Sequence, residues 1–142
     1  MPIVASIISR GSYHESGHVI VALHFGVKVE QVAIRAGKPA TVLTLNDSKF
    51  ATQERCLVLT GGIAAEQMML GNYDRDAAKS DQHDIVLFGG EPIGNYLDCA
   101  TAILAGYKPC LQALHKEFFA ANVESLFRGS LRSDARLHTH GR

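Results

Sequence analysis

The sequence has few cysteines, the residues that could stabilise a small protein through disulfides or through a thiolate metal site. Its 142 residues contain three cysteines, Cys56, Cys99 and Cys110, and no two of them form a CxxC pair. An odd and widely spaced set is a poor disulfide framework and a poor thiolate zinc site. We therefore expect reduced, mostly buried thiols in a cytoplasmic protein.

Excess charge and long apolar runs are also lacking. Fourteen basic residues balance fourteen acidic ones, so the formal net charge is zero. Nucleic-acid binding would need clustered Lys and Arg, and we expect no such partner. No run approaches the ~18 apolar residues of a membrane span. The N-terminal segment MPIVASIISR is short and has no basic region before it, so it is a weak signal-peptide candidate.

The length suits a single domain over residues 1–142, with 130–142 as a frayed tail. Period and turn residues predict a mainly helical chain with one small hairpin. The expected helices are 12–25 (ending at Gly26), 46–70 (capped by 46–48 and closed by Gly71), 81–88, 93–105 and 109–127; the expected strands are 27–34 and 41–45. This pattern predicts an α+β fold, with residues 74–80 as a polar connection.

The segment YHESGH at positions 13–18 contains the HExxH pattern. Residues four apart lie one turn apart on the same helix face, so His14 and His18 can bind one ion. We expect zinc, one per chain. Glu15 would then take a proton from a water on the metal, as a catalytic general base. The chance of a random HExxH match in such a chain is about one to two per cent.

Another interpretation of these residues is a capping box, in which Glu15 bonds back to the backbone of Ser12. It leaves the two histidines unexplained and does not exclude a metal. Catalytic zinc usually has three protein ligands, so one more must come from elsewhere. His24 lies about 600° around the helix from His18 and faces away. The third ligand must therefore come from later in the chain.

Three blocks resemble the peptidase domain of the FtsH-type ATP-dependent zinc proteases. YHESGH followed by apolar residues is similar to that family's YHEAGHA, and LTGGIAAE at 59–66 is similar to its LGGRAAEE. A third block, AAKSDQHDI at 77–85, stands where the family has a TGAxxDxxxA-like stretch. The resemblance covers roughly residues 13–90. It implies a zincin-like peptidase domain.

The resemblance also implies the remaining site residues. Asp81 matches the family's third metal ligand, and Asp84 fits that role less well. The block lacks the glycine-containing lead-in that the family has before this Asp. Glu66 is the second choice, either as third ligand or as a partner that orients a ligand histidine; the alternative is simple exposure. Glycines 61 and 62 cost helix stability, which is tolerable where another backbone approaches closely.

The implied activity is zinc-dependent hydrolysis of peptide bonds in unfolded or flexible polypeptides. The family's ATPase module is missing, because no GxxxxGK[ST] motif occurs. A separate ATPase partner and a homo-oligomer are further implications, since the resembled domains assemble as rings. Two alternatives stay open: a catalytically degenerate domain that binds metal or protein, and a small-amide hydrolase using the same metal chemistry. The hairpin edge is a candidate site for an extended peptide.

Overall fold

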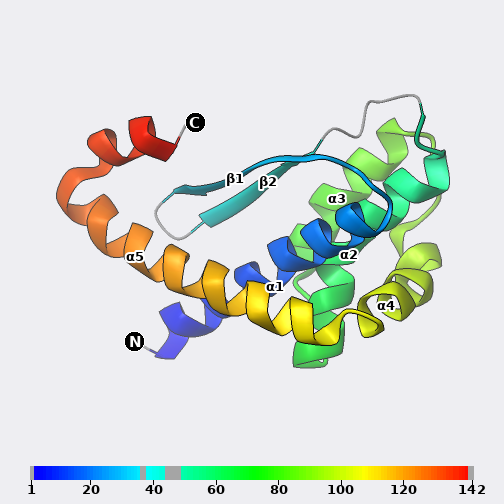
Figure 1. The fold of residues 1–142 in the computed structure, drawn as a ribbon. Helices are drawn as coiled ribbons and strands as arrows, with labels where there is room; N and C mark the ends of the chain where they lie inside the picture. Colours follow the sequence, from blue (N-terminus) through cyan, green and yellow to red (C-terminus); the bar gives the residue numbers. More distant parts are fainter. Residues whose placement is uncertain (1, 36–37, 44–48, 141–142) are drawn as a thin grey trace.

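The computed structural model describes residues 2–35, 38–43 and 49–140, and the side chains of 3–29 and 49–126. Its elements in chain order are α1 (Pro2–His24), β1 (Val29–Arg35), β2 (Lys38–Leu43), α2 (Thr52–Leu70), α3 (Arg75–Leu87), the 3-10 turn η1 (Ile93–Tyr96), α4 (Leu97–Ala105) and α5 (Lys108–His140). Figure 1 shows the long helix α5 crossing α1, which it contacts, and bending toward its C-terminal end. Among these residues, no helix has both the length and the apolar character to cross a bilayer.

The predicted α+β class is wrong, and the protein is all-α in class. Helices supply nearly all of the buried core, which joins Val21 of α1, Val58 of α2, Leu104 of α4 and Leu111 of α5. The segments predicted as strands pair only with each other, in a two-stranded antiparallel ribbon with Val32 opposite Thr41. The β-branched residues favour extended chain, and the result is a ribbon of two strands. Without a third strand, this ribbon does not form a sheet layer of the fold.

The helix that carries HExxH starts earlier than predicted. It begins at Pro2, a residue that fits a first turn, and ends before Gly26, as expected. Ser12 therefore lies in the helix interior, where its hydroxyl donates to the carbonyl of Ile8 at 2.7 Å. The capping-box interpretation of Ser12 and Glu15 is wrong, because Ser12 is no N-cap.

Some of the other helix boundaries also differ from the predicted ones. The predicted cap at 46–48 lies outside the described residues. Helix α2 begins at Thr52, with the Glu54 carboxylate accepting from the backbone amide of Ala51 at 2.9 Å, and ends at Gly71 as predicted. Helix α3 takes in most of the expected polar connection, because Asp74 caps it through the amide of Asp76. Helix α5 continues to His140 through the expected tail.

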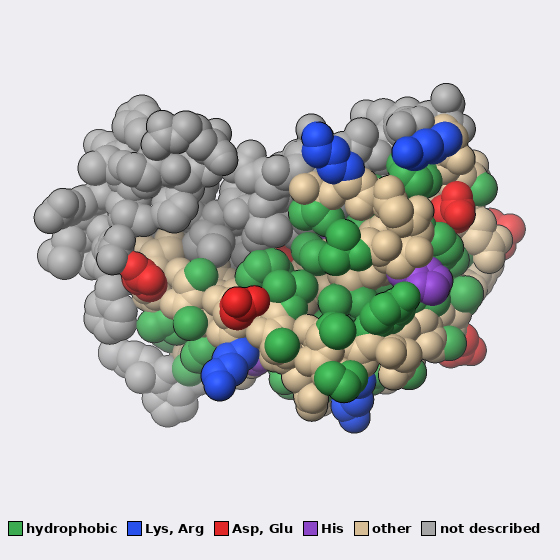
Figure 2. All heavy atoms as spheres, viewed as in Figure 1, with side chains coloured by type: hydrophobic (Ala, Val, Ile, Leu, Met, Phe, Trp, Pro, Cys, Tyr) green, Lys and Arg blue, Asp and Glu red, His purple; other side chains and the backbone are tan. Residues whose placement is uncertain are grey.

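The thiols differ from the expectation as well. All three are free, but only Cys56 is buried, while Cys99 on α4 and Cys110 on α5 are exposed. On the face shown in Figure 2, charged side chains of the described residues are scattered singly among hydrophobic ones.

Candidate metal centre

His14 and His18 lie one turn apart on α1 and face the same side, as their spacing predicts. Both are buried, and their rings meet edge to face with centroids 4.6 Å apart. This face of α1 packs against α2, with which it makes its most extensive contact. The two imidazoles are therefore held between helices and away from bulk water.

Asp81 joins them from α3. Its Oδ2 atom lies 3.0 Å from Nε2 of His14 and 3.5 Å from Nε2 of His18. The three side chains each offer one ligand atom, and these atoms all lie within 4.8 Å of one another. Ile85, one turn further along α3, is fully buried. We call His14, His18 and Asp81 the donor cluster.

The opposite nitrogen of each ring has a fixed acceptor. Nδ1 of His18 lies 2.9 Å from the carbonyl oxygen of Val58, which can only accept, so this nitrogen carries a hydrogen. Nδ1 of His14 lies 2.6 Å from Oε2 of Glu66 and donates to that carboxylate. Both rings therefore turn Nε2 toward the donor cluster, the arrangement in which protein groups orient histidine ligands of metals.

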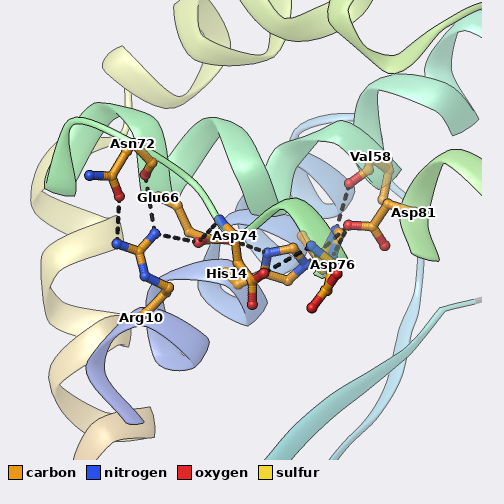
Figure 3. Close-up of polar contacts among 9 residues, drawn as sticks. Arg10, His14, Val58, Glu66, Asn72, Asp74, Asp76 and Asp81 are labelled. Atoms are coloured by element: carbon orange, nitrogen blue, oxygen red, sulfur yellow. Dashed lines mark hydrogen bonds and ion pairs between the residues drawn. The ribbon is translucent and has the colours of Figure 1, made fainter. Parts of the chain in front are cut away.

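Glu66 thus contacts His14 through Nδ1, on the side of the ring opposite the donor cluster, as expected of a group that orients this histidine. Glu66 is fully buried, so the alternative of exposure is wrong. Its Oε1 atom accepts from Nη1 of Arg10 at 2.8 Å and from the backbone amide of Asp74 at 2.9 Å (Figure 3). Arg10 is a residue of this network that was not predicted from the sequence. Its position four residues before His14, on the same helix face, was the available indication.

Close contact between α1 and α2 depends on glycines, as predicted for residues 61 and 62. A Cβ atom on Gly61 would lie 2.7 Å from the carbonyl oxygen of Gly17 on α1. One on Gly62 would lie 2.5 Å from Nε2 of His14. Neither distance leaves room for a methyl group. The two glycines let the backbone of α2 form the wall beside the histidines.

The electrostatics favour positive charge at the cluster. Burial lowers the pKa of His14, but hydrogen bonds with Asp81 and Glu66 and nearby carboxylate charge outweigh burial and raise the pKa to about 10. Burial opposes the charged form of His18 too, yet Asp81 raises its pKa. Burial raises the pKa of Asp81, but both histidines outweigh it and hold the pKa well below its usual value.

Glu15 is buried beside the cluster. Its charge helps to raise the pKa of both His14 and His18, which places the carboxylate near the two rings. Two other histidines lie away from the cluster. His24 contacts the hydroxyl of Tyr107 through Nδ1 at 2.8 Å, away from the cluster, and His83 is exposed on α3.

The residues present fit a zinc ion. Oδ2 of Asp81 is buried, and it meets no hydrogen-bond donor while both rings are neutral, because the atoms near it are the two Nε2 atoms. With neutral rings and Nδ1 protonated, three lone pairs would converge and repel one another. A cation removes this conflict, whether it is a proton on a ring or a metal ion. Two imidazoles and one carboxylate are a usual donor set for catalytic zinc, which leaves a fourth position open.

Comparison of the chain with protein-family models, curated proteins and solved structures finds no match. The resemblance to the FtsH-type peptidases therefore depends on the three short sequence blocks and the site they form.

Proposed function

We propose that the protein is a zinc-dependent metallopeptidase that hydrolyses peptide bonds in unfolded or flexible polypeptides. The observation that carries this proposal is the convergence of His14, His18 and Asp81 with the opposite ring nitrogens already bonded. Glu15, which is buried next to His14 in the chain and whose charge helps to raise the pKa of both rings, supports it. Missing coordination of a metal by Asp81 would favour the degenerate alternative.

A zinc ion bound there would polarise the scissile carbonyl and lower the pKa of a water to about 7. Glu15 would accept the proton of that water and pass it to the leaving amine. Glu66 and the Val58 carbonyl would hold the rings in one tautomer throughout. Asp81 would keep one negative charge on the cluster.

The proposed substrate class, unfolded or flexible polypeptides, rests on the resemblance. A separate ATPase partner, assembly as a homo-oligomer and a cytoplasmic location are parts of the same proposal and rest on the resemblance.

The test uses protein purified without a His tag, zinc analysis by mass spectrometry, and casein as an unstructured substrate. We expect one zinc per chain and slow casein cleavage. Glu15→Gln should keep the zinc and lower cleavage at least about 100-fold, the range for loss of a general base. Glu117→Gln makes the same change at an exposed glutamate on α5 and should have no effect.

Two results would contradict the proposal. Unchanged cleavage of casein by the Glu15→Gln variant would rule out Glu15 as the general base. Zinc binding without cleavage of casein or any small amide would favour the degenerate domain.

A further inference from the structure

Arg10 makes a forked contact beside the donor cluster. Its Nη1 atom lies 2.8 Å from Oε1 of Glu66 and 3.3 Å from the backbone oxygen of Asn72, and its Nη2 atom lies 2.6 Å from Oδ1 of Asn72 (Figure 3). The guanidinium therefore spans the end of α2 and the turn that follows it. A planar fork suits two acceptors at once, which a single ammonium group does not.

The Glu66 carboxylate transmits this contact to the histidine. Its Oε1 atom receives Arg10 and the Asp74 amide, while Oε2 receives Nδ1 of His14. The side chain is only 1% exposed, so no water shell competes to set its orientation. Fixing one oxygen of this rigid group fixes the other, and with it the plane and tautomer of the His14 ring.

Arg10 also joins the three elements that carry the donors. It stands on α1, one turn before His14, and contacts Glu66 on α2. Through Asn72 it holds the turn that leads into α3, the helix that carries Asp81. The Arg10 side chain therefore connects the elements that carry His14 and Asp81, although Arg10 is not itself part of the donor cluster.

We propose that Arg10 is a positioning residue for metal binding: it holds Glu66 against His14 and fixes the turn from which α3 brings Asp81. This inference depends on the zinc site proposed above. It assigns Arg10 no contact with metal or substrate. Its effect should appear in zinc affinity, through Glu66, and not in the folding of the chain alone.

The first experiment measures zinc affinity by competition with a chromogenic chelator. Arg10→Met should weaken binding about tenfold, the lower end for partners of ligand histidines. Arg10→Lys keeps the charge but not the fork, and should recover part of that loss. Arg55→Met is the matched control, because Arg55 lies at the other end of α2 from Glu66 and contacts Phe88. Its affinity should stay within about twofold of wild type.

A double-mutant cycle tests whether Arg10 acts through Glu66. In the Glu66→Gln background, Arg10→Met should weaken zinc binding less than it does in wild type, since the transmitting carboxylate is gone and only the contact with Asn72 is left to lose. A readout without metal is amide exchange at Asp74, whose N–H donates to Glu66. Exchange should speed up in zinc-free Arg10→Met and not in Arg55→Met.

Should Arg10→Met fail to fold, Asn72→Ala provides the test at an exposed position and should weaken zinc binding about threefold. Zinc affinity within about twofold of wild type in the folded Arg10 variants would overturn the inference, as would an equal loss in the Glu66→Gln background. Both results leave the proposed function standing. A wild-type protein that binds no zinc would overturn the proposed function and this inference together.

Discussion

Histidines lie at two faces of α1 in similar surroundings, but their pKa values shift in opposite directions. On one face His14 lies buried against α2. On the other, His115 of α5 stacks on Tyr13 with ring centroids 3.5 Å apart and contacts the hydroxyl of Ser9 at 3.1 Å. Burial lowers the pKa of both histidines. The carboxylates of Asp81 and Glu66 reverse the shift at His14, whereas the pKa of His115 stays lowered.

The difference shows what separates the histidine proposed as a metal ligand from a packing histidine in this fold. Burial and aromatic neighbours are common to both. At His14 a carboxylate faces each ring nitrogen. Asp81, at Nε2, belongs to the donor cluster, and Glu66, at Nδ1, orients the ring. The comparison predicts that variants at the two positions differ most in metal binding.

The largest expected difference is in zinc affinity. His14→Ala removes a direct ligand and should weaken zinc binding by more than about 100-fold, beyond the range for orienting partners. His115→Gln should leave zinc affinity unchanged within about twofold. Chelator competition on the two proteins measures both values. Equal losses at the two positions would erase the distinction between the faces.

The spacing of His14 and His18 allowed this distinction to be predicted in part. A four-residue interval on a helix is sufficient to place two rings on one face. Asp81 and Glu66 were found through the resembling blocks, because nothing local ties a carboxylate on α3 or α2 to α1. Arg10 was missed for the same reason: its partners lie 56 and 62 residues away along the chain.

The fold was less accessible than the site. Helix ends at Gly26 and Gly71 follow from local backbone geometry and were predicted correctly. The class was wrong, because extended propensity at 27–34 and 41–45 does not tell whether a third strand exists. The start of α1 was placed too late, because Ser12 matches a cap in sequence while the chain continues the helix through it.

The next prediction concerns pH and the zinc-free protein. The folded-state pKa of His14 lies above its ordinary 6.5, at about 10, so its contribution to stability is full below pH 6.5 and is lost as the pH rises through 10. The pKa of His115 is lowered, so its contribution is full above pH 6.5 and is lost as the pH falls. Between pH 7 and 9.5 only the first effect should appear.

Urea unfolding of the zinc-free protein measures this change. Wild type should lose stability on the order of a few kcal/mol relative to His14→Gln across pH 7–9.5. Zinc affinity should rise over the same range, because bound histidines must give up their protons. A difference between wild type and His14→Gln that does not vary with pH would contradict the account of the cluster.

The smallest expected effect concerns the wall beside the histidines. Gly62→Ala would place a methyl group against the His14 ring and should cost about 1–3 kcal/mol of stability, as overpacking does. It should also weaken zinc binding, because the ring must move. Gly94→Ala is the matched control, since a Cβ there meets no atom within 4 Å among the described residues. Thermal unfolding of the two variants shows whether close approach at Gly62 matters.

The central claim is that two imidazoles of α1 and one carboxylate of α3 meet on a single cation. X-ray absorption at the zinc edge of the loaded wild-type protein tests it most directly. The account predicts two imidazole nitrogens at about 2.0–2.1 Å with oxygen completing the set and no sulfur. Sulfur at about 2.3 Å, from the exposed Cys99 or Cys110, or fewer than two imidazoles, would contradict it.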